Sequence, residues 1–384
     1  MTSAATAAAD THTASASHGP VIASGQCRVL YAFDVGLAID LDACRRMVVE
    51  AGTDEWVRRR GSPSYFAYHP PPLRIQDVAR ELVPGTPRSG IEASRGEVAI
   101  TLYDFGAVTV EYNYPLSGPL AGLLPLSREL DGNVTLQQDA AGRTARVLER
   151  IRSAVTRFEL QSAVEDYVIF QVDRFDRPTD AQSLLAAHAP LLAAILRAEA
   201  GPLDAAEVEE VLRNRLIYGT SDLVIIDWNS AFVFDKDCDD TLSVLQFANV
   251  ELLEMRWLDG QLNRSLDEAY HLLSRPRPFW RRMLRPYGRV SARISSLQVD
   301  AAVLFENVNN AIKLVGDQYL ARVYRRALER FHLAEWDADI LRKLDVLRDI
   351  HQSLVDRAGA ARMEALEWII ILLIAAEIVL SFVR

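Results

Sequence analysis

The first part of the chain contains short apolar runs separated by turn residues, a pattern that predicts β-strands. From Val98 to Leu102, every second residue is large and apolar, which is the two-residue period of a strand with one buried face. The order of apolar run, Asp-centred turn and apolar run occurs three times, at residues 29–41, 98–112 and 223–234. Each predicts a β-hairpin, because Asp can bond its own backbone across a turn and the following residues permit it to close.

Other segments of this part predict a mixture of strands and helices. Strands are predicted at residues 64–68, 157–161 and 167–172, and helices at residues 181–198 and 204–213. Asp204 and Glu207 have the spacing of a capping box at the start of the second helix. Because strands and helices mix without regular alternation, we expect an α+β domain.

From residue 241 onward the apolar spacing becomes helical. Residues 242–273 predict one helix, and positions from Ile294 to Val315 then follow steps of three and four. A second seam of this kind runs from Ile340 to Ala365 and includes His351, which is interpreted as a core or interface histidine. Such seams predict long, coiled-coil-like helices. No proline separates the second seam from the apolar terminus, so one continuous helix is predicted there.

The terminal run from Trp368 to Val383 is apolar on all faces except at Glu377. Its sixteen residues span about 24 Å as a helix, whereas a hydrocarbon core measures about 30 Å. The run is interpreted as a transmembrane anchor, with a buried core helix or an apolar oligomerisation arm as the alternative. An interfacial Trp at its entrance favours the anchor, and Glu377 in lipid would predict self-association. The predicted anchor residues are Trp368, Ile371, Leu372, Glu377 and Phe382.

The pattern as a whole predicts an α+β head domain with β-hairpins, a long-helix (coiled-coil-like) stalk and one C-terminal transmembrane helix. The predicted limits are a disordered tail at 1–24, the α+β domain at 25–240, the helical stalk at 241–364 and the anchor at 365–384. The tail lacks the basic start and apolar stretch of a secretory signal. We therefore expect a single-pass protein of the inner (cytoplasmic) membrane, with its large N-terminal part cytoplasmic.

The net charge of −10 argues against a nucleic-acid binder that relies on overall charge. A basic stretch nevertheless begins at Arg275 and contains no Asp or Glu up to Gln298. Arginines among aromatic residues suit single-stranded RNA, and arginines with Trp also suit anionic lipid headgroups. A solvated loop is the third interpretation. Membrane contact is preferred, and the predicted contact residues are Arg275, Arg277, Trp280, Arg281, Arg282, Arg285 and Arg289.

The residues 362–377 read Arg-Met-Glu-Ala-Leu-Glu-Trp-Ile-Ile-Ile-Leu-Leu-Ile-Ala-Ala-Glu. They resemble the closing signature of the Required for Meiotic Nuclear Division family, whose fungal members are called Sad1-interacting factors. Residues 316–324 and 341–347 resemble its helical segment, and the chain looks like a bacterial member. The resemblance implies a C-terminal anchor, self-assembly and no established enzymatic activity. It also implies a link to translation, because some relatives tether ribosomes.

The sequence contains no recognisable catalytic or cofactor motif. It lacks a phosphate-binding loop, a dinucleotide fingerprint, HExxH and GxSxG, and we predict no cofactor and no metal. The acidic cluster at 235–240 has Asp240 where a calcium loop requires Gly. It is interpreted as a solvated loop in which Asp239 or Asp240 caps the next helix.

The leading hypothesis is a non-enzymatic, membrane-anchored oligomeric scaffold or tether that presents the α+β domain, with membrane lipid and further copies of itself as partners. The alternative is an RNA- or ribosome-associated membrane tether that supports translation. A third hypothesis is an enzyme that uses the turn carboxylates Asp34, Asp104 and Asp227. Against it stands the simpler interpretation that each Asp only closes its own turn.

Overall fold

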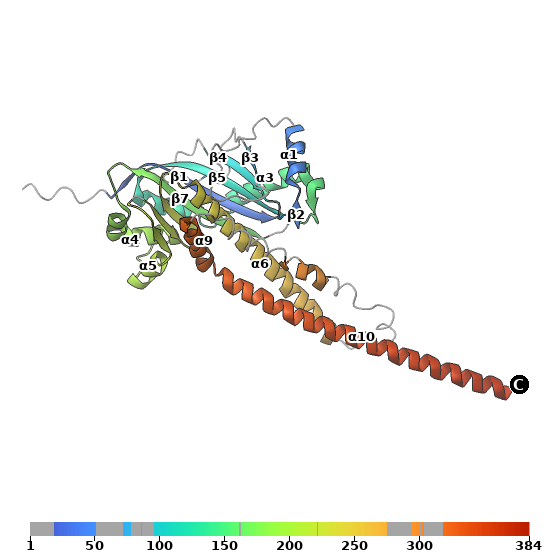
Figure 1. The fold of residues 1–384 in the computed structure, drawn as a ribbon. Helices are drawn as coiled ribbons and strands as arrows, with labels where there is room; N and C mark the ends of the chain where they lie inside the picture. The colour runs from blue at the N-terminus through green and yellow to red at the C-terminus, as the bar shows by residue number, and fades with distance from the viewer. Residues whose placement is uncertain are drawn as a thin grey trace, which may run out of the picture. The chain divides into compact units, whose positions relative to one another are not determined.

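The computed structural model describes residues 19–50, 72–77, 86, 96–160, 163–220, 222–274, 293–299, 301–302 and 318–383. The chain divides into two units. The first combines Met1–Leu253 with Ile312–Phe331, and the second combines Glu254–Ala311 with His332–Arg384. The first unit is therefore built from two separate parts of the sequence (Figure 1).

The strands lie in the earlier part of the chain, together with several helices, and the last part of the chain is helical. The strands are β1 (Val21–Asp34), β2 (Ala38–Ile39), β3 (Leu73–Asp77), β4 (Glu97–Leu102), β5 (Ala107–Pro119), β6 (Val155–Thr156), β7 (Val164–Phe175), β8 (Arg215–Ile217), β9 (Leu223–Ile226) and β10 (Ser230–Phe234). The helices are α1 (Leu41–Glu50), α2 (Leu123–Leu130), α3 (Val134–Ile151), α4 (Ala181–Arg197), α5 (Ala205–Leu212), α6 (Asp239–Ser274), α9 (Gln318–Arg330) and α10 (Leu333–Val383), with short 3-10 turns at Leu120–Gly122 and Arg152–Ala154.

Eight strands form one mixed sheet in the order β3-β4-β5-β1-β7-β10-β9-β8. All neighbours pair antiparallel except β7 and β10, which run parallel. The long strand β1 lies in the middle and pairs along its length with β5 on one side and β7 on the other. The remaining strands, β2 and β6, form a separate two-stranded sheet.

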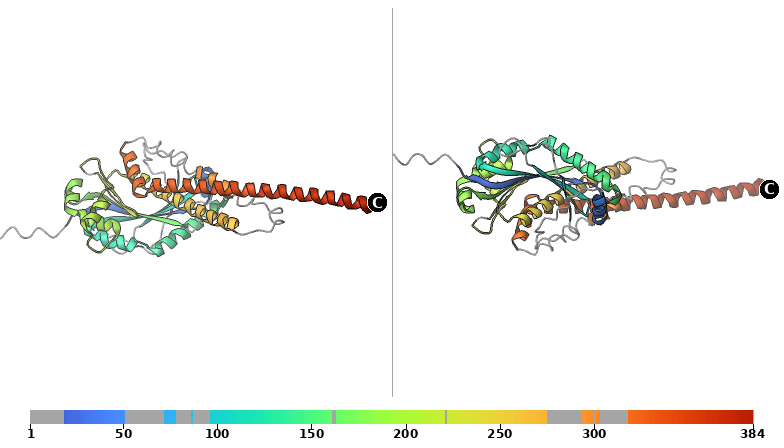
Figure 2. Two further views of the ribbon diagram at one scale, coloured as in Figure 1. Left: turned by 90° about the horizontal axis from the view of Figure 1, so that it is seen from below. Right: turned by 90° about the horizontal axis from the view of Figure 1, so that it is seen from above.

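Each face of the large sheet is covered by helices (Figure 2). Alternate β1 residues such as Val29 and Phe33 join the main core, together with apolar residues of α2, α3 and α4. On the opposite face, Val250 and Leu253 of α6 pack with Ala32 and Ala107. The two-residue period of a strand thus distributes apolar side chains to both layers, as expected for a sheet buried on both sides. The fold of this unit is α+β.

Two of the three predicted hairpins are confirmed, and one is wrong. The strands β4 and β5 pair across the Asp104 turn, and β9 and β10 pair across the Asp227 turn. The segment 29–41 forms no hairpin, because β1 pairs with β5 and β7 while β2 pairs with β6. The Val35 N–H donates to the Gly106 carbonyl at 3.0 Å. A Cβ at Gly106 would lie 1.8 Å from the Gly36 carbonyl oxygen, so this approach requires glycine.

The other local predictions fared unevenly. The helices at 181–198 and 204–213 are confirmed as α4 and α5, and Asp204 and Glu207 form the predicted capping box. The strand at 167–172 is confirmed within β7. Residues 157–160 form no strand, because Arg157 takes a positive φ of 51° directly after β6. The predicted strand at 64–68 lies outside the described residues.

In the second unit, α10 is one helix that includes both the second seam and the apolar terminus, as predicted. The seam residues Ile340, Leu344 and Leu347 are buried. Lys343 bonds Asp259 of α6 and also Asp339 one turn earlier. In the first seam Ile294, Leu297 and Ala301 are buried, and its positions from 303 to 315 lie beyond the part that the structure describes.

The predicted transmembrane helix is wrong. Among the described residues, none of the helices is both long enough and apolar enough to cross a membrane. The apolar run is shorter than the roughly twenty residues of a span, and it contains Glu377 and follows Glu364 and Glu367. The predicted anchor residues Trp368, Ile371, Leu372, Glu377 and Phe382 therefore lie on α10 without forming a span, and the single-pass inner-membrane location that depended on them is corrected with it.

Burial of the three cysteines leads to a first testable prediction. Cys27, Cys44 and Cys238 are all buried free thiols. Burial raises the pKa of Cys238 to about 12 and that of Cys44 to about 11, and it raises the pKa of Cys27 further. Because the thiolate is the reactive form, we expect native protein at pH 8 to resist dithionitrobenzoate over minutes. Three thiols should react after denaturation, whereas one fast thiol in native protein would contradict the packing.

Candidate functional site

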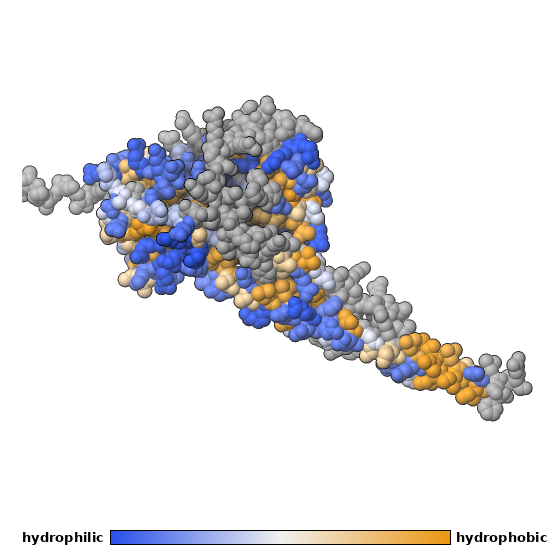
Figure 3. Space-filling view, in the orientation of Figure 1, coloured by the Kyte–Doolittle hydropathy of each residue, from blue (hydrophilic) through white to orange (hydrophobic). Residues whose placement is uncertain are grey.

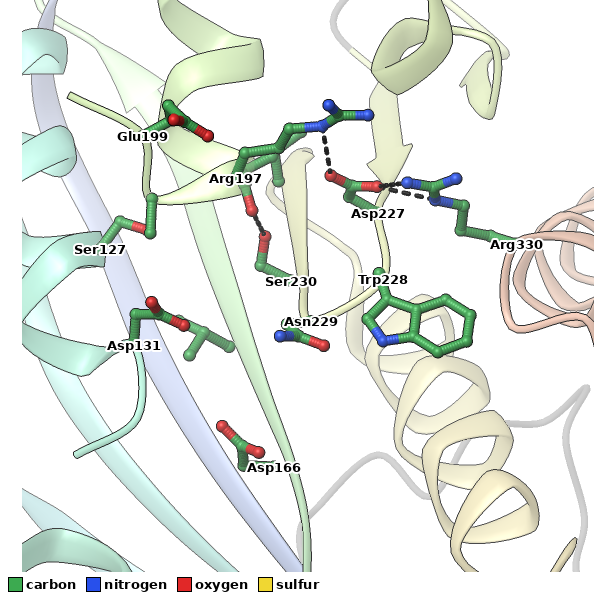
Figure 4. Close-up of a pocket in the computed structure, with 13 residues that line it drawn as sticks. Ser127, Asp131, Asp166, Arg197, Glu199, Asp227, Trp228, Asn229, Ser230 and Arg330 are labelled. Carbon is green, nitrogen blue, oxygen red and sulfur yellow. Dashed lines mark hydrogen bonds and ion pairs between the residues drawn. The ribbon is translucent and has the colours of Figure 1, made fainter. Parts of the chain in front are cut away.

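An open pocket of about 220 Å³ lies in the first unit (Figure 4). Its walls come from the C-terminal ends of α2 and α4, from β7, from the β9–β10 turn and from the end of α9. Thirteen residues line it: Ser127, Asp131, Asp166, Val168, Leu196, Arg197, Ala198, Glu199, Asp227, Trp228, Asn229, Ser230 and Arg330.

Asp227 is the buried carboxylate at the base of this site, with 3% of its side chain exposed. Its N–H donates to the Ser230 carbonyl at 2.8 Å and closes the β9–β10 turn. Arg330 donates its Nε to Asp227 Oδ1 at 2.7 Å and a terminal N–H to the same oxygen. Arg197 approaches the other oxygen, Oδ2, at 3.9 Å. The carboxylate is thus bound from two sides by guanidinium groups (Figure 4).

Both arginines also bind Glu210 of α5. The distances are 3.1 Å from Arg197 and 3.4 Å from Arg330, and the hydrogen bond from Arg197 is the main cause that lowers the pKa of Glu210. Two cations and two anions therefore join α4, α5, α9 and the β9–β10 turn. Tyr167 supports the turn, because its hydroxyl lies 3.1 Å and 2.9 Å from the carbonyl oxygens of Asp227 and Ser230.

Two serine hydroxyls in the pocket are directed at the end of α4. Ser127 donates to the Ile195 carbonyl at 2.6 Å, and Ser230 donates to the Leu196 carbonyl at 2.8 Å. The last carbonyls of a helix have no partner within it, and α4 ends at Ala198 in the left-handed conformation. Ser230 satisfies the Leu196 carbonyl, and Ser127 is a second donor to the Ile195 carbonyl, which also accepts the Ala198 N–H at 3.2 Å. The negative end of the helix dipole faces the pocket.

The remaining charged side chains of the lining are acidic. Asp131 follows α2, Asp166 lies on β7 and Glu199 follows α4, and all three stand around the open space in Figure 4. Trp228 and Asn229 of the β9–β10 turn lie on another side. Four carboxylates against two guanidinium groups leave the lining with a formal excess of two negative charges.

The turn carboxylates Asp34, Asp104 and Asp227 have different surroundings. Asp34 accepts the Gly36 N–H at 3.0 Å, so it closes its own turn as the simpler interpretation expected. Asp104 is half-buried, and burial raises its pKa. The turns at Asp34 and Asp104 contact each other through the hydrogen bond from the Val35 N–H to the Gly106 carbonyl. Asp227, by contrast, is bound by arginines. Over the described ranges, no three His, Cys, Asp or Glu side chains are grouped so that they could hold a metal ion.

The acidic cluster at 235–240 is a loop that leads into α6. The Asp237 N–H donates to Asp235 at 2.8 Å, and the Cys238 carbonyl accepts the Leu242 N–H at 2.9 Å. Asp239 and Asp240 lie in the first turn of α6, so Cys238 occupies the capping position one residue earlier than predicted. Both carboxylates lie near the positive end of the helix dipole, where negative charge stabilises the helix.

The predicted basic contact residues lie outside the described residues: Arg275, Arg277, Trp280, Arg281, Arg282, Arg285 and Arg289. At the end of this stretch, Arg293 is described. It donates to Gln261 at 3.0 Å and lies 3.8 Å from Glu268. That one arginine therefore pairs within the protein.

Sequence reasoning missed most of the pocket. It singled out Asp227 but not its partners Arg330 and Arg197. Arg330 lies 103 residues along the chain from Asp227, and one arginine on an amphipathic helix carries no pattern of its own. The usable signal was the Asp-Trp-Asn turn at 227–229, which places a large aromatic residue beside a carboxylate.

Comparison with known proteins corrects the family assignment. The family described as "Uncharacterized protein MJ0711, N-terminal domain" matches residues 24–241. Uncharacterized protein MJ0711 of Methanocaldococcus jannaschii is 24% identical over 238 residues, which cover 60% of this chain and 70% of that protein. No solved structure matches.

The resemblance to the Required for Meiotic Nuclear Division family is therefore wrong. It rested on the apolar helix near the C-terminus and on the helical segments at 316–324 and 341–347, and apolar helical patterns recur in unrelated proteins because many helices need an apolar surface. The match that overturns it covers the strand-rich part of the chain, including the sheet and four sides of the pocket. This chain belongs to the MJ0711 N-terminal domain family.

Proposed function

We propose that the protein is a non-enzymatic scaffold whose copies assemble through the last part of α10. The proposal rests on the exposed apolar surface of residues 366–379, here named the apolar arm, in which Glu367 and Glu377 are the charged residues (Figure 3). Ten of its large side chains are between 47% and 64% exposed: Leu366, Trp368, Ile369, Ile370, Ile371, Leu372, Leu373, Ile374, Ile378 and Val379.

An exposed surface of this kind is rare on proteins that act alone. Monomeric proteins seldom expose contiguous apolar patches larger than a few hundred Å², and water around such a patch raises the free energy of the free chain. The arm therefore supports a function in which it is covered by another molecule.

The distribution of apolar residues around the helix supports a bundle rather than a pair. Seven consecutive large apolar residues, from Trp368 to Ile374, occupy almost two turns and so face every direction. A two-stranded coiled coil covers only one stripe of each helix. A helix that is apolar all round is buried on all sides, which several neighbouring helices can provide.

We propose that the apolar arm is covered by the arms of other copies of this chain. An identical arm has the same length and an equally apolar surface, with Glu367 and Glu377 as its charged residues. Because α10 is one helix from residue 333 to residue 383, the arm is continuous with the earlier part of α10, which also belongs to the second unit. Assembly would then gather several copies of the α+β unit, which is the scaffold role.

The RNA- or ribosome-tether alternative stays a prediction without additional support. Its arginines and Trp280 lie outside the described residues, and the described Arg293 pairs with Gln261 and Glu268. We therefore favour the assembly role, which rests on described side chains.

Light scattering of the full chain after size-exclusion chromatography tests the proposal. We expect the natural protein to be an oligomer and the double variant Ile370→Glu, Leu373→Glu to be a monomer, because each buried charge would weaken association by about 2 kcal/mol or more. The control is Leu341→Glu, which adds one carboxylate at a 51% exposed position of α10 outside the arm. A monomeric natural protein, or an arm variant that still assembles, would refute the proposal.

A further inference from the structure

We infer that the apolar arms take up protons when copies of the chain assemble, so that a fall in pH strengthens the assembly. This regulation rests on the proposed function of the arm. It follows from the two carboxylates of the arm, Glu367 and Glu377, from the apolar side chains beside them and from the basic residues that the surrounding sequence lacks.

Glu367 and Glu377 lie on one side of α10. They are ten residues apart, which in a helix is about 15 Å along the axis and about 80° around it. On that side, Ile370 follows Glu367 by three residues and Ile374 precedes Glu377 by three, and residues three apart are neighbours on a helix surface. These isoleucines are 56% and 51% exposed. A neighbouring helix that covers both isoleucines therefore covers the two carboxylates as well.

No cation of the same arm is available to the two carboxylates. Within the part of the chain that the structure describes, Glu367 and Glu377 are exposed and form neither a hydrogen bond nor an ion pair. The sequence has no Lys, Arg or His from residue 363 to residue 383, and its one other charged residue in this span is Glu364. In an assembly of arms, the titratable groups that face each carboxylate are thus further carboxylates.

Covering the arms changes which form of these carboxyl groups is favoured. A carboxylate that loses its water beside apolar side chains becomes less stable relative to the protonated acid, and like charges brought close to it act in the same direction. The assembled copies therefore bind more protons than the separate chains do. By linkage, the association constant rises as the pH falls, by about tenfold per pH unit for each proton taken up.

Sedimentation velocity of the full chain at about pH 8 and about pH 6 tests the inference. We expect the concentration at which half of the chains are assembled to be about tenfold or more lower at the lower pH. The double variant Glu367→Gln, Glu377→Gln carries the uncharged counterpart of the protonated acid at both positions. It should assemble at pH 8 about as tightly as the natural protein does at pH 6, and its assembly should not change with pH.

The matched control is the double variant Glu149→Gln, Glu209→Gln. It removes the same two charges at exposed positions of α3 and α5, outside the arm. This control should keep the pH response of the natural protein, which separates an effect of the arm from an effect of net charge. Circular dichroism of all variants at both pH values checks that the helices remain folded.

The outcomes separate the regulation from the assembly itself. An oligomer whose dissociation does not change with pH would overturn the inference and leave the assembly intact. An equal pH response of the natural protein and of Glu367→Gln, Glu377→Gln would also overturn it, because groups outside the arm would then be titrating. A natural protein that is monomeric at both pH values would refute the assembly together with its regulation.

Discussion

Replacing Glu111 by Leu is expected to lower the free energy of unfolding by about 3–5 kcal/mol, because it leaves a buried guanidinium without its counter-charge. Glu111 and Arg28 are each 2% exposed in the middle of the large sheet. Arg28 binds Glu111 Oε1 at 2.7 Å, and Arg74 and Gln246 bind the other oxygen, Oε2, at 3.0 Å each. No other carboxylate is described within bonding distance of Arg28 in the residues that the structure covers.

The double variant Arg28→Met, Glu111→Leu should regain much of this loss, since paired buried charges can often be exchanged for apolar residues at little cost. Urea denaturation followed by circular dichroism measures all four members of the cycle. The exposed pair Arg45 and Asp42 of α1 provides the control, and Asp42→Asn should change stability by less than about 0.5 kcal/mol. Arg28 also donates to Gln171 at 3.1 Å and to Gln26 at 2.7 Å. A double variant as unstable as Glu111→Leu alone would show that these hydrogen bonds, not the charge pair, dominate.

Replacing Arg330 by Ala is expected to destabilise the first unit by about 2–4 kcal/mol, because Asp227 would stay buried with only the distant Arg197 as a cation. The loss should be smaller for Arg330→Lys, which keeps the charge but lacks the two N–H groups that bind Asp227 Oδ1. Differential scanning calorimetry and urea denaturation provide the measurements.

The neighbouring Arg326 gives the matched control for this prediction. It lies on the same helix, and its partner Glu329 is about half exposed. Exposed pairs contribute little, so Arg326→Ala should leave the unfolding midpoint almost unchanged. Equal effects of the two variants would mean that Arg330 acts through helix propensity rather than through Asp227.

The sequence pattern correctly predicted elements whose structure depends only on interactions between neighbouring residues. The capping box at Asp204 and the hairpin around Asp104 need only neighbouring residues, and both were predicted from the sequence. The hairpin at 29–41 failed because long-range pairing decided it: β1 pairs with residues of β7 up to 153 positions away, the separation of Ile22 and Phe175. The charged centre of the sheet was also invisible, since Arg28, Glu111 and Gln171 look like ordinary outward-facing polar residues in alternating strands.

For the terminal helix, the local pattern was predicted correctly but its surroundings were not. Its apolar residues were identified correctly, but apolar character alone does not tell lipid from a protein interface, and the membrane interpretation was wrong. The pocket depended on tertiary placement altogether, because it joins ends of helices and a turn that are far apart in the sequence.

The discontinuous first unit has a consequence for biosynthesis. Asp227 precedes Arg330 by 103 residues, so a ribosome that adds about 5–20 residues per second makes the carboxylate about 5–20 s before its partner. During that interval the whole sheet has been synthesised, yet α9 is missing from the unit. The nascent protein therefore waits with a completed sheet in which Asp227 has only the more distant Arg197 as a cation, until α9 supplies Arg330.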